Sequence, residues 1–130
     1  MASREKKKAE ARKQKRAEGP ARAESRGLRM SARKARVIAD IVRGKSVDEA
    51  LTALAFQKRK AANPLRKVLD SAVANADQRG LDLDRLVIKD VQIDKGPMMR
   101  RYLPRAHGRA TRIRKQTSHI SVQLAESAED

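Results

Sequence analysis

The sequence predicts an α+β domain in which three helices pack on a small antiparallel sheet and a long β-hairpin protrudes from it. Three observations indicate this fold class. Apolar residues recur at helical spacing in three segments between residues 31 and 80. They alternate at strand spacing near residues 86–93 and 120–124. Helices on one face of such a sheet would bury both sets, and the basic segment between the two strands would form the hairpin.

The first predicted helix runs from Ser31 to Gly44. Ala35, Ile38 and Val42 recur every three or four residues, so they share one helix face. A glycine just after the last apolar residue is typical of a helix C-terminus. We expect this apolar face to be buried against the sheet.

The second predicted helix is short and begins at Ser46, which stands three residues before Glu49. This is the spacing of a capping box, in which the serine accepts from the backbone three residues on and the glutamate reaches back. Its buried face should consist of Val47, Ala50, Leu51 and Leu54.

The third predicted helix has the most regular apolar period of the chain and ends at Gly80. Pro64 must lie in its first turn, because a proline further in would remove a helical hydrogen bond. Either Asn63 caps this helix or the helix starts slightly earlier. Its apolar face is formed by Leu65, Val68, Leu69, Ala72, Val73 and Ala76.

Strands are predicted over residues 86–93 and 120–124, after the third helix. A third strand is predicted over residues 23–30, although Gly27 counts against it. The strands and helices together give one domain over residues 21–124, with the extended hairpin at about residues 88–122.

The two ends of the chain lie outside this domain. Residues 1–20 hold eight basic and three acidic residues and no large apolar side chain beyond Met1, so this extension cannot pack on a core. We expect it to be disordered or transiently helical on its own. Two interpretations stay open: it gains order against phosphates, or it is a solvated tail without fixed contacts. Residues 125–130 form an acidic tail.

The composition indicates a soluble, cytoplasmic protein with a polyanionic partner. Lys and Arg number 32 against 16 Asp and Glu, a formal charge of +16, which opposes compaction and favours nucleic-acid binding. There is no cysteine, and no apolar run approaches the roughly 20 residues that span a membrane. The aromatic residues are Phe56 and Tyr102 alone, so we expect recognition to depend on backbone charge and shape rather than on base stacking.

The segment from residue 95 to residue 124 holds eight basic residues and no acidic one, which is half of the net charge. If strand pairing continues outward, the midpoint between Val87 and Val122 places the hairpin tip near Pro104. About 15 residues per side would reach about 50 Å. Pro97 and Pro104 each remove a donor from the ladder, so we expect this arm to be mobile until RNA surrounds it.

No catalytic, metal or cofactor site is predicted, and we expect the protein not to be an enzyme. Asp82 and Asp84 form a carboxylate pair, but they follow Gly80 in an exposed loop. The two histidines, His107 and His119, lie within the acid-free segment, which offers neither a metal site nor a general base its usual partners.

Six short motifs stand out between residues 27 and 124. They are Arg-Lys-Ala-Arg at 33–36, Ile-Val-Arg-Gly-Lys at 41–45, Ser-Ala-Val-Ala-Asn-Ala at 71–76, Gly-Pro at 96–97, Pro-Arg-Ala-His-Gly-Arg-Ala at 104–110 and Thr-Ser-His-Ile at 117–120. Together they resemble the universal large-subunit ribosomal protein family known as L-twenty-two, in its bacterial type. The chain departs from the family at Ala32, where many members carry proline.

The resemblance implies a structural constituent of the large ribosomal subunit that binds and helps assemble its RNA. The hairpin would line the nascent-peptide exit tunnel near the macrolide-binding region, with Met99, Arg100, Arg101 and Tyr102 at a tunnel-facing tip. Implied partners are ribosomal RNA, neighbouring large-subunit proteins and, transiently, the nascent peptide, without homo-oligomers. The predicted RNA contacts are Arg29, Arg33, Lys34, Arg36, Lys58, Arg59, Lys60, Lys95, Arg100, Arg101, Arg105, His107, Arg109, Arg112, Arg114, Lys115, Thr117, Ser118 and His119.

Composition alone leaves a second class open, an architectural DNA-binding protein or RNA chaperone, because a basic β-ribbon also fits duplex grooves. Co-sedimentation with large ribosomal subunits at high salt separates the two classes. Release into a nucleoid fraction would contradict the ribosomal class.

Overall fold

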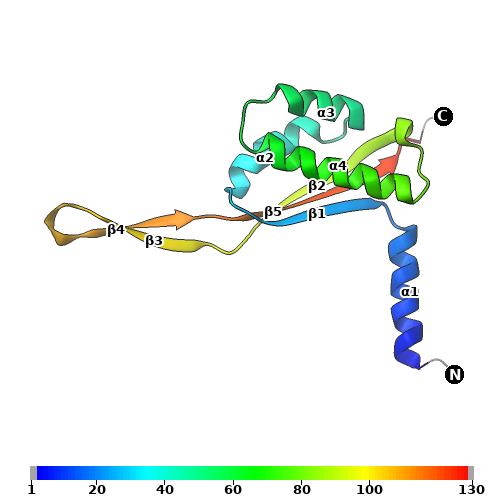
Figure 1. The fold of residues 1–130 in the computed structure, drawn as a ribbon, viewed down its shortest axis with the longest axis horizontal. Helices are drawn as coiled ribbons and strands as arrows, with labels where there is room; N and C mark the ends of the chain where they lie inside the picture. Colours follow the sequence, from blue (N-terminus) through cyan, green and yellow to red (C-terminus); the bar gives the residue numbers. More distant parts are fainter. Residues whose placement is uncertain (1–2, 129–130) are drawn as a thin grey trace.

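The computed structural model describes residues 3–128 as a helical layer on a three-stranded sheet, a two-stranded arm and a projecting N-terminal helix (Figure 1). This confirms the α+β class, with one helix more than the three predicted. In chain order the elements are α1 (Arg4–Glu18), β1 (Ala21–Leu28), α2 (Ala32–Val42), α3 (Val47–Phe56), α4 (Ala62–Gln78), the 3-10 helix η1 (Leu83–Arg85), β2 (Leu86–Lys95), β3 (Met99–Pro104), the 3-10 helix η2 (Ala106–Gly108), β4 (Ala110–Lys115) and β5 (Ser118–Glu126).

The body sheet is antiparallel with strand order β1-β5-β2, so the last strand of the chain lies at its centre. The presence of β1 confirms the prediction of a third strand, against which Gly27 had counted. Gly27 lies where the pairing with β5 shifts register, with φ of 70°, a conformation that glycine adopts without strain. Strand β2 is continuous and contains a bulge between Ile88 and Asp90.

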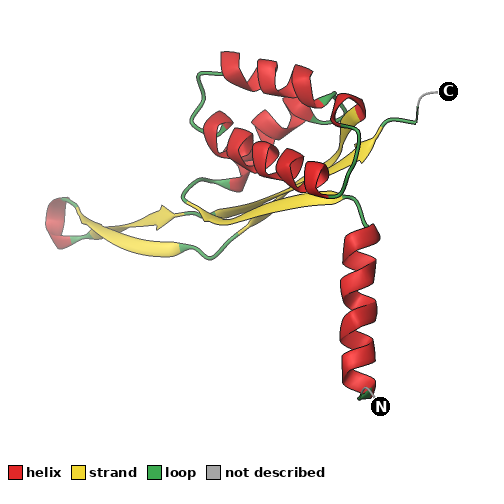
Figure 2. Cartoon of the chain, turned by 45° about the vertical axis from the view of Figure 1, so that its right-hand side comes forward, coloured by secondary structure: helices red, strands yellow, loops and turns green. Residues whose placement is uncertain are grey.

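Helices α2, α3 and α4 cover one face of this sheet (Figure 2). The Ser46 hydroxyl accepts from the Glu49 backbone N–H at 3.4 Å, as the capping spacing predicts. Helix α4 starts after Ala61, so the earlier of the two predicted starts is correct and Asn63 lies inside the helix.

The end of α4 shows why Gly80 stops it. Gly80 has φ of 72°, and its N–H donates to the Asp77 carbonyl at 2.9 Å. The next N–H, of Leu81, donates back to the Ala76 carbonyl at 3.2 Å. This pair of bonds is a Schellman motif, which needs a left-handed residue where glycine stands.

The hydrophobic core lies between the helices and the sheet. The predicted apolar stripes supply it, and Leu51 and Val73 pack at its margin. Burying each large side chain stabilises the fold by about 1.5–3 kcal/mol. The largest fully buried side chains are Ile38, Leu65, Leu69, Leu86, Ile88, Ile120 and Leu124.

Polar side chains from the helices bond to the backbone of the two outer strands. The Arg36 guanidinium of α2 donates to the Ile93 carbonyl at 3.0 and 3.2 Å. Arg43, at the end of the same helix, donates to the Val91 carbonyl at 2.7 Å. On the opposite edge, the Asn75 amide of α4 donates to a β1 carbonyl at 2.9 Å. These bonds pair carbonyls that would otherwise lack a protein donor.

The arm is a separate two-stranded ribbon rather than an unbroken extension of the body sheet. Pairing of β2 with β5 ends at Lys95 opposite Ser118 and resumes at Met99 opposite Lys115. Between these points the ladder is interrupted, and the ribbon extends away from the body (Figure 1).

The tip of the arm lies at residues 105–109, beyond the position near Pro104 that the sequence predicts. Val87 pairs with Ala125, and not with a residue near Val122, so the turn moves outward. The bulge in β2 adds a further residue on that strand.

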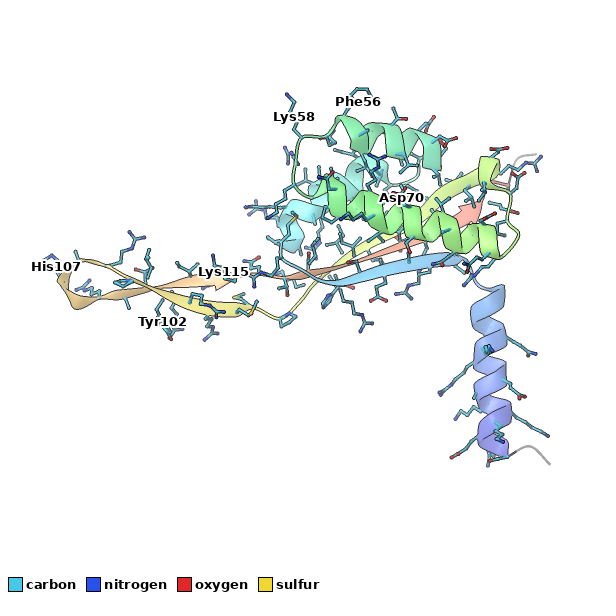
Figure 3. The ribbon with its side chains drawn as sticks, in the orientation of Figure 1. Phe56, Lys58, Asp70, Tyr102, His107 and Lys115 are labelled. Carbon is cyan, nitrogen blue, oxygen red and sulfur yellow. The ribbon has the colours of Figure 1, made fainter. Side chains whose placement is uncertain are left out.

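Consequently the four residues predicted at the tip lie nearer the body. Residues 99–102 pair with residues 112–115, and Tyr102 lies between the body and His107 at the far end (Figure 3). The turn itself is closed by the Arg105 N–H, which donates to the Arg109 carbonyl at 2.7 Å.

Helix α1 projects away from the body (Figures 1 and 2). The sequence leaves disorder and a transient helix both open for this segment, and the structure has the helix. Its junction with the body is held by Arg79 of α4, whose guanidinium donates to the carbonyls of Gly19 and Pro20.

Candidate nucleic-acid interface

A basic groove lies where the arm joins the body. Its volume is about 620 Å³, and five of its eight lining residues are cationic while none is acidic. It brings together residues from the β1–α2 connection, α2, the α3–α4 loop and β4. The lining residues are Arg29, Met30, Ser31, Lys34, Lys60, Arg114, Lys115 and Gln116. We call this site the root groove. It assembles five predicted RNA contacts that are far apart in the sequence.

The arm presents two different faces. Side chains alternate along a strand, so the pairing places Arg100 and Tyr102 on one face with Arg114 and Arg112 opposite them. Like charges directly opposite each other destabilise a strand pair, and Arg100 faces Arg114. An anion beside this face would offset that repulsion.

The other face of the arm is more apolar. It carries Met99, Leu103 and Ile113, with Arg101 among them and Lys115 opposite Met99. Arg29 of the body donates to the Met99 sulfur at 3.8 Å, which places the beginning of β3 beside the root groove. An arm of this kind can touch phosphates on one side and apolar groups on the other.

The remaining predicted contacts on the arm and the nearby loop are exposed. Lys95 ends β2, and Lys58 and Arg59 lie in the α3–α4 loop. Figure 3 labels Lys58 at the outer side of the body. Arg105, His107 and Arg109 form the tip, where His107 has φ of 60°. This left-handed conformation is uncommon for a residue other than glycine.

The three predicted RNA contacts on helix α2 have different surroundings. Arg33 and Lys34 are exposed, and Lys34 lines the root groove. Arg36 is partly committed to the Ile93 carbonyl, so it joins helix to sheet as well as carrying charge. Arg43 has the same role, which its sequence position alone did not show.

Two predicted contacts are buried, and a third is half-buried and bonded within the protein. Thr117 and Ser118 are 7% and 0% exposed, so their side chains do not present a surface to RNA. Thr117 donates to the Pro97 carbonyl at 2.6 Å. His119 accepts from the Gly27 N–H through Nδ1 at 3.0 Å, which is a backbone-capping role. Neighbouring segments of the fold decide this burial, and the motif itself did not reveal it.

The sheet face away from the helices carries both signs of charge, unlike the arm. Asp90 and Asp94 of β2 lie on this face, as does Glu24 of β1. Arg26 donates to Glu24 at 2.7 Å, and this hydrogen bond lowers the pKa of the Glu24 carboxyl. Carboxylates that stay ionised repel phosphates, so this face is a poor RNA surface.

Asp82, one of the two carboxylates considered for catalysis, has structural partners. The Asp82 carboxylate accepts from the Asp84 N–H at 3.1 Å and lies 3.5 Å from Arg85 Nε. Among residues 3–128, no three His, Asp or Glu side chains are arranged to hold a metal ion. No helix in that range is long and apolar enough to cross a membrane.

Comparison with known proteins shows which family the sequence resembles. The family model for "Ribosomal protein L22p/L17e" matches residues 23–125. The chain is 53% identical over 107 residues to the large ribosomal subunit protein uL22 of Syntrophotalea carbinolica, which covers 82% of this chain and 97% of that protein. It is 52% identical over 99 residues to uL22 of Geobacter sulfurreducens, covering 75% and 89%. Helix α1 precedes the residues that the family model matches.

Proposed function

This chain belongs to the ribosomal protein L22p/L17e family, and from that membership we propose that its arm lines the nascent-peptide exit tunnel near the macrolide-binding region. The protein is a structural constituent of the large ribosomal subunit in the cytoplasm and not an enzyme. Family membership also decides against the DNA-binding alternative.

The root groove carries the proposal for RNA binding. Cations that the fold gathers without any acidic neighbour repel each other, and ribosomal RNA phosphates would offset that repulsion. Arginine and lysine together suit this role, because the guanidinium fork binds phosphate oxygens bidentately and the ammonium adds a point charge. We infer that the body supplies affinity through this groove and that the arm supplies position.

The two faces of the arm support the tunnel proposal. An arm that lines a tunnel has RNA on one side and the passing peptide on the other. The face with Arg100, Arg112 and Arg114 would lie on RNA, and the face with Met99 and Leu103 would lie toward the lumen. Met99 to Tyr102 remain the residues we propose nearest the tunnel wall, in the half of the arm closer to the body instead of at its tip.

Charge reversal tests the groove. We expect Lys60→Glu and Arg114→Glu each to weaken binding to large-subunit ribosomal RNA and to flatten the plot of log affinity against log salt. The slope should change by about 0.7–0.9 for each phosphate that the variant no longer neutralises. Lys89→Glu is the matched control, because Lys89 is exposed at the β2 bulge away from the groove. Equal effects at all three positions would show that only net charge matters.

Deletion of Met99 to Arg101 tests the division of roles. Subunits should still incorporate the protein, since the deletion retains every residue that lines the root groove. The response to macrolides should change, because the deletion removes half of β3 and an odd number of residues inverts its alternation. Sedimentation of subunits and growth with a macrolide measure the two traits. Loss of incorporation would contradict the division.

A further inference from the structure

Phe56 is an exposed aromatic ring that neither the core nor the root groove uses. It is 82% exposed, the most of any large hydrophobic residue in the described range. It is the last residue of α3, outside the stripe formed by Val47, Ala50 and Leu54 that faces the core. The composition led us to expect little base stacking. One aromatic ring that is exposed to solvent can nevertheless stack on one nucleic-acid base.

The stretch of chain around Phe56 carries basic side chains and no acidic one. No acidic residue occurs between Glu49 and Asp70. Within this stretch, Lys58, Arg59 and Lys60 follow the ring in an exposed loop, and Figure 3 shows Phe56 and Lys58 at the same outer corner of the body.

The loop connects the ring to the root groove. Lys60 lines that groove and stands four positions after Phe56. Four residues span at most about 14 Å, so a nucleic-acid strand held at Lys60 needs only a few nucleotides to reach the ring. The ring and the groove are therefore close enough for one short nucleic-acid segment to contact both.

The same neighbourhood argues against a protein partner. A protein interface needs a cluster of apolar side chains at its centre. The other exposed large hydrophobics in the described residues lie on α2, η1, the arm and the turn before it: Val37, Leu83, Met98, Met99, Tyr102 and Leu103. A single ring flanked by cations fits a nucleotide, which offers one flat π-face and one phosphate.

We propose that Phe56 stacks on an unpaired base of the bound RNA, while Lys58 and Arg59 hold phosphates of the same strand. This inference rests on the proposed RNA-binding function, and it adds a recognition mode that the basic groove lacks. Basic side chains bind the phosphate backbone of any RNA strand. A base can stack on the ring only if it is not paired within an RNA helix. The site would therefore select a bulge or loop over a continuous duplex.

Two substitutions separate stacking from apolar contact. Phe56→Leu keeps apolar bulk and removes the π-face, and Phe56→Tyr keeps the face. We expect the leucine variant of the full chain to bind large-subunit ribosomal RNA about 5- to 150-fold more weakly. The tyrosine variant should bind as the unaltered protein does.

Salt dependence separates this site from the groove. The factor by which Phe56→Leu weakens binding should be the same at low and high salt, because stacking involves no counterion release, whereas Lys58→Ala should change the salt slope. A leucine variant with unchanged affinity, or a tyrosine variant as weak as leucine, would overturn the stacking site. Absence of salt-dependent RNA binding in the unaltered protein would instead refute the proposed function itself.

Fluorescence gives a second readout that does not depend on affinity. The chain has no tryptophan, so Phe56→Trp introduces a single indole. Its emission should be quenched by the ribosomal RNA and not by a perfect RNA duplex. Leu83→Trp is the control, since Leu83 is 43% exposed beside Asp82 and Asp84. Equal quenching of both tryptophans, or quenching by the duplex, would contradict a site for an unpaired base.

Discussion

Gly96 lies where the body sheet ends, and its neighbours leave no room for a side chain. A Cβ at this position would stand 2.4 Å from Thr117 Oγ1 and 3.2 Å from His119 Cε1. Thr117 is itself fixed by its bond to the Pro97 carbonyl. Gly96, Pro97 and Thr117 thus hold the two strands of the arm together where strand pairing is interrupted.

Gly96→Ala should destabilise the body by about 1–3 kcal/mol, the usual cost of overpacking. Urea unfolding of the free protein measures this free energy. Thr117→Ala removes the nearest atom of the clash, so the double variant should be more stable than the sum of the single effects allows. Strict additivity would mean that the two positions do not touch in solution.

Arg36 and Arg33 are matched arginines of α2 with different surroundings. Arg36→Ala should lower the free energy of unfolding by about 1–2 kcal/mol, because the Ile93 carbonyl loses its donor. Arg33→Ala should change it by less than about 0.5 kcal/mol, as expected at an exposed position. Thermal or urea unfolding compares the two variants. Equal losses of unfolding free energy would argue against the hydrogen bond from Arg36 to the Ile93 carbonyl.

At the scale of elements, the regular helices and the existence of the arm were predictable, but the position of its tip was not. Helix α4 follows from its apolar period and from Gly80, both of which are local. The arm tip depends on one bulge near Ile88 and on where pairing stops, and these depend on contacts between distant segments. The burial of Thr117 and Ser118 has the same cause, since a strand motif does not show which neighbours cover it.

The arm should be far less protected than the body in the free protein. Two paired strands of six residues are marginal in water, and here they carry facing arginines. Hydrogen exchange should therefore be fast for the amides of β3 and β4 and slow for those of β5. Binding to ribosomal RNA should slow exchange in the arm. Comparable protection of β4 and β5 without RNA would contradict this expectation.

At the scale of the whole molecule, charge is spread over three basic regions: helix α1, the root groove and the arm. The net charge is +16, and residues 1–18 contribute eight basic against three acidic residues. Such repulsion destabilises the compact state, and added salt screens it, since the Debye length is about 10 Å at 0.1 M salt.

The free protein should accordingly gain thermal stability as sodium chloride is raised at constant pH. A variant without residues 1–18 should show a smaller gain, because it carries less positive charge. Calorimetry over a salt series measures both. A gain that is equal in the two proteins would show that α1 is electrostatically independent of the body.

The bonds that Arg36, Arg43 and Asn75 make to the sheet backbone also govern the protein before it meets any RNA. An open strand edge is a template on which a second copy can add its own strand, and this is a common route to aggregation. Carbonyls already engaged by helix side chains are less available to such a strand, because the side chain occupies the position of the incoming backbone. The helices therefore reduce the part of each edge on which a second copy could pair, and the facing arginines of the arm would repel the arm of another copy.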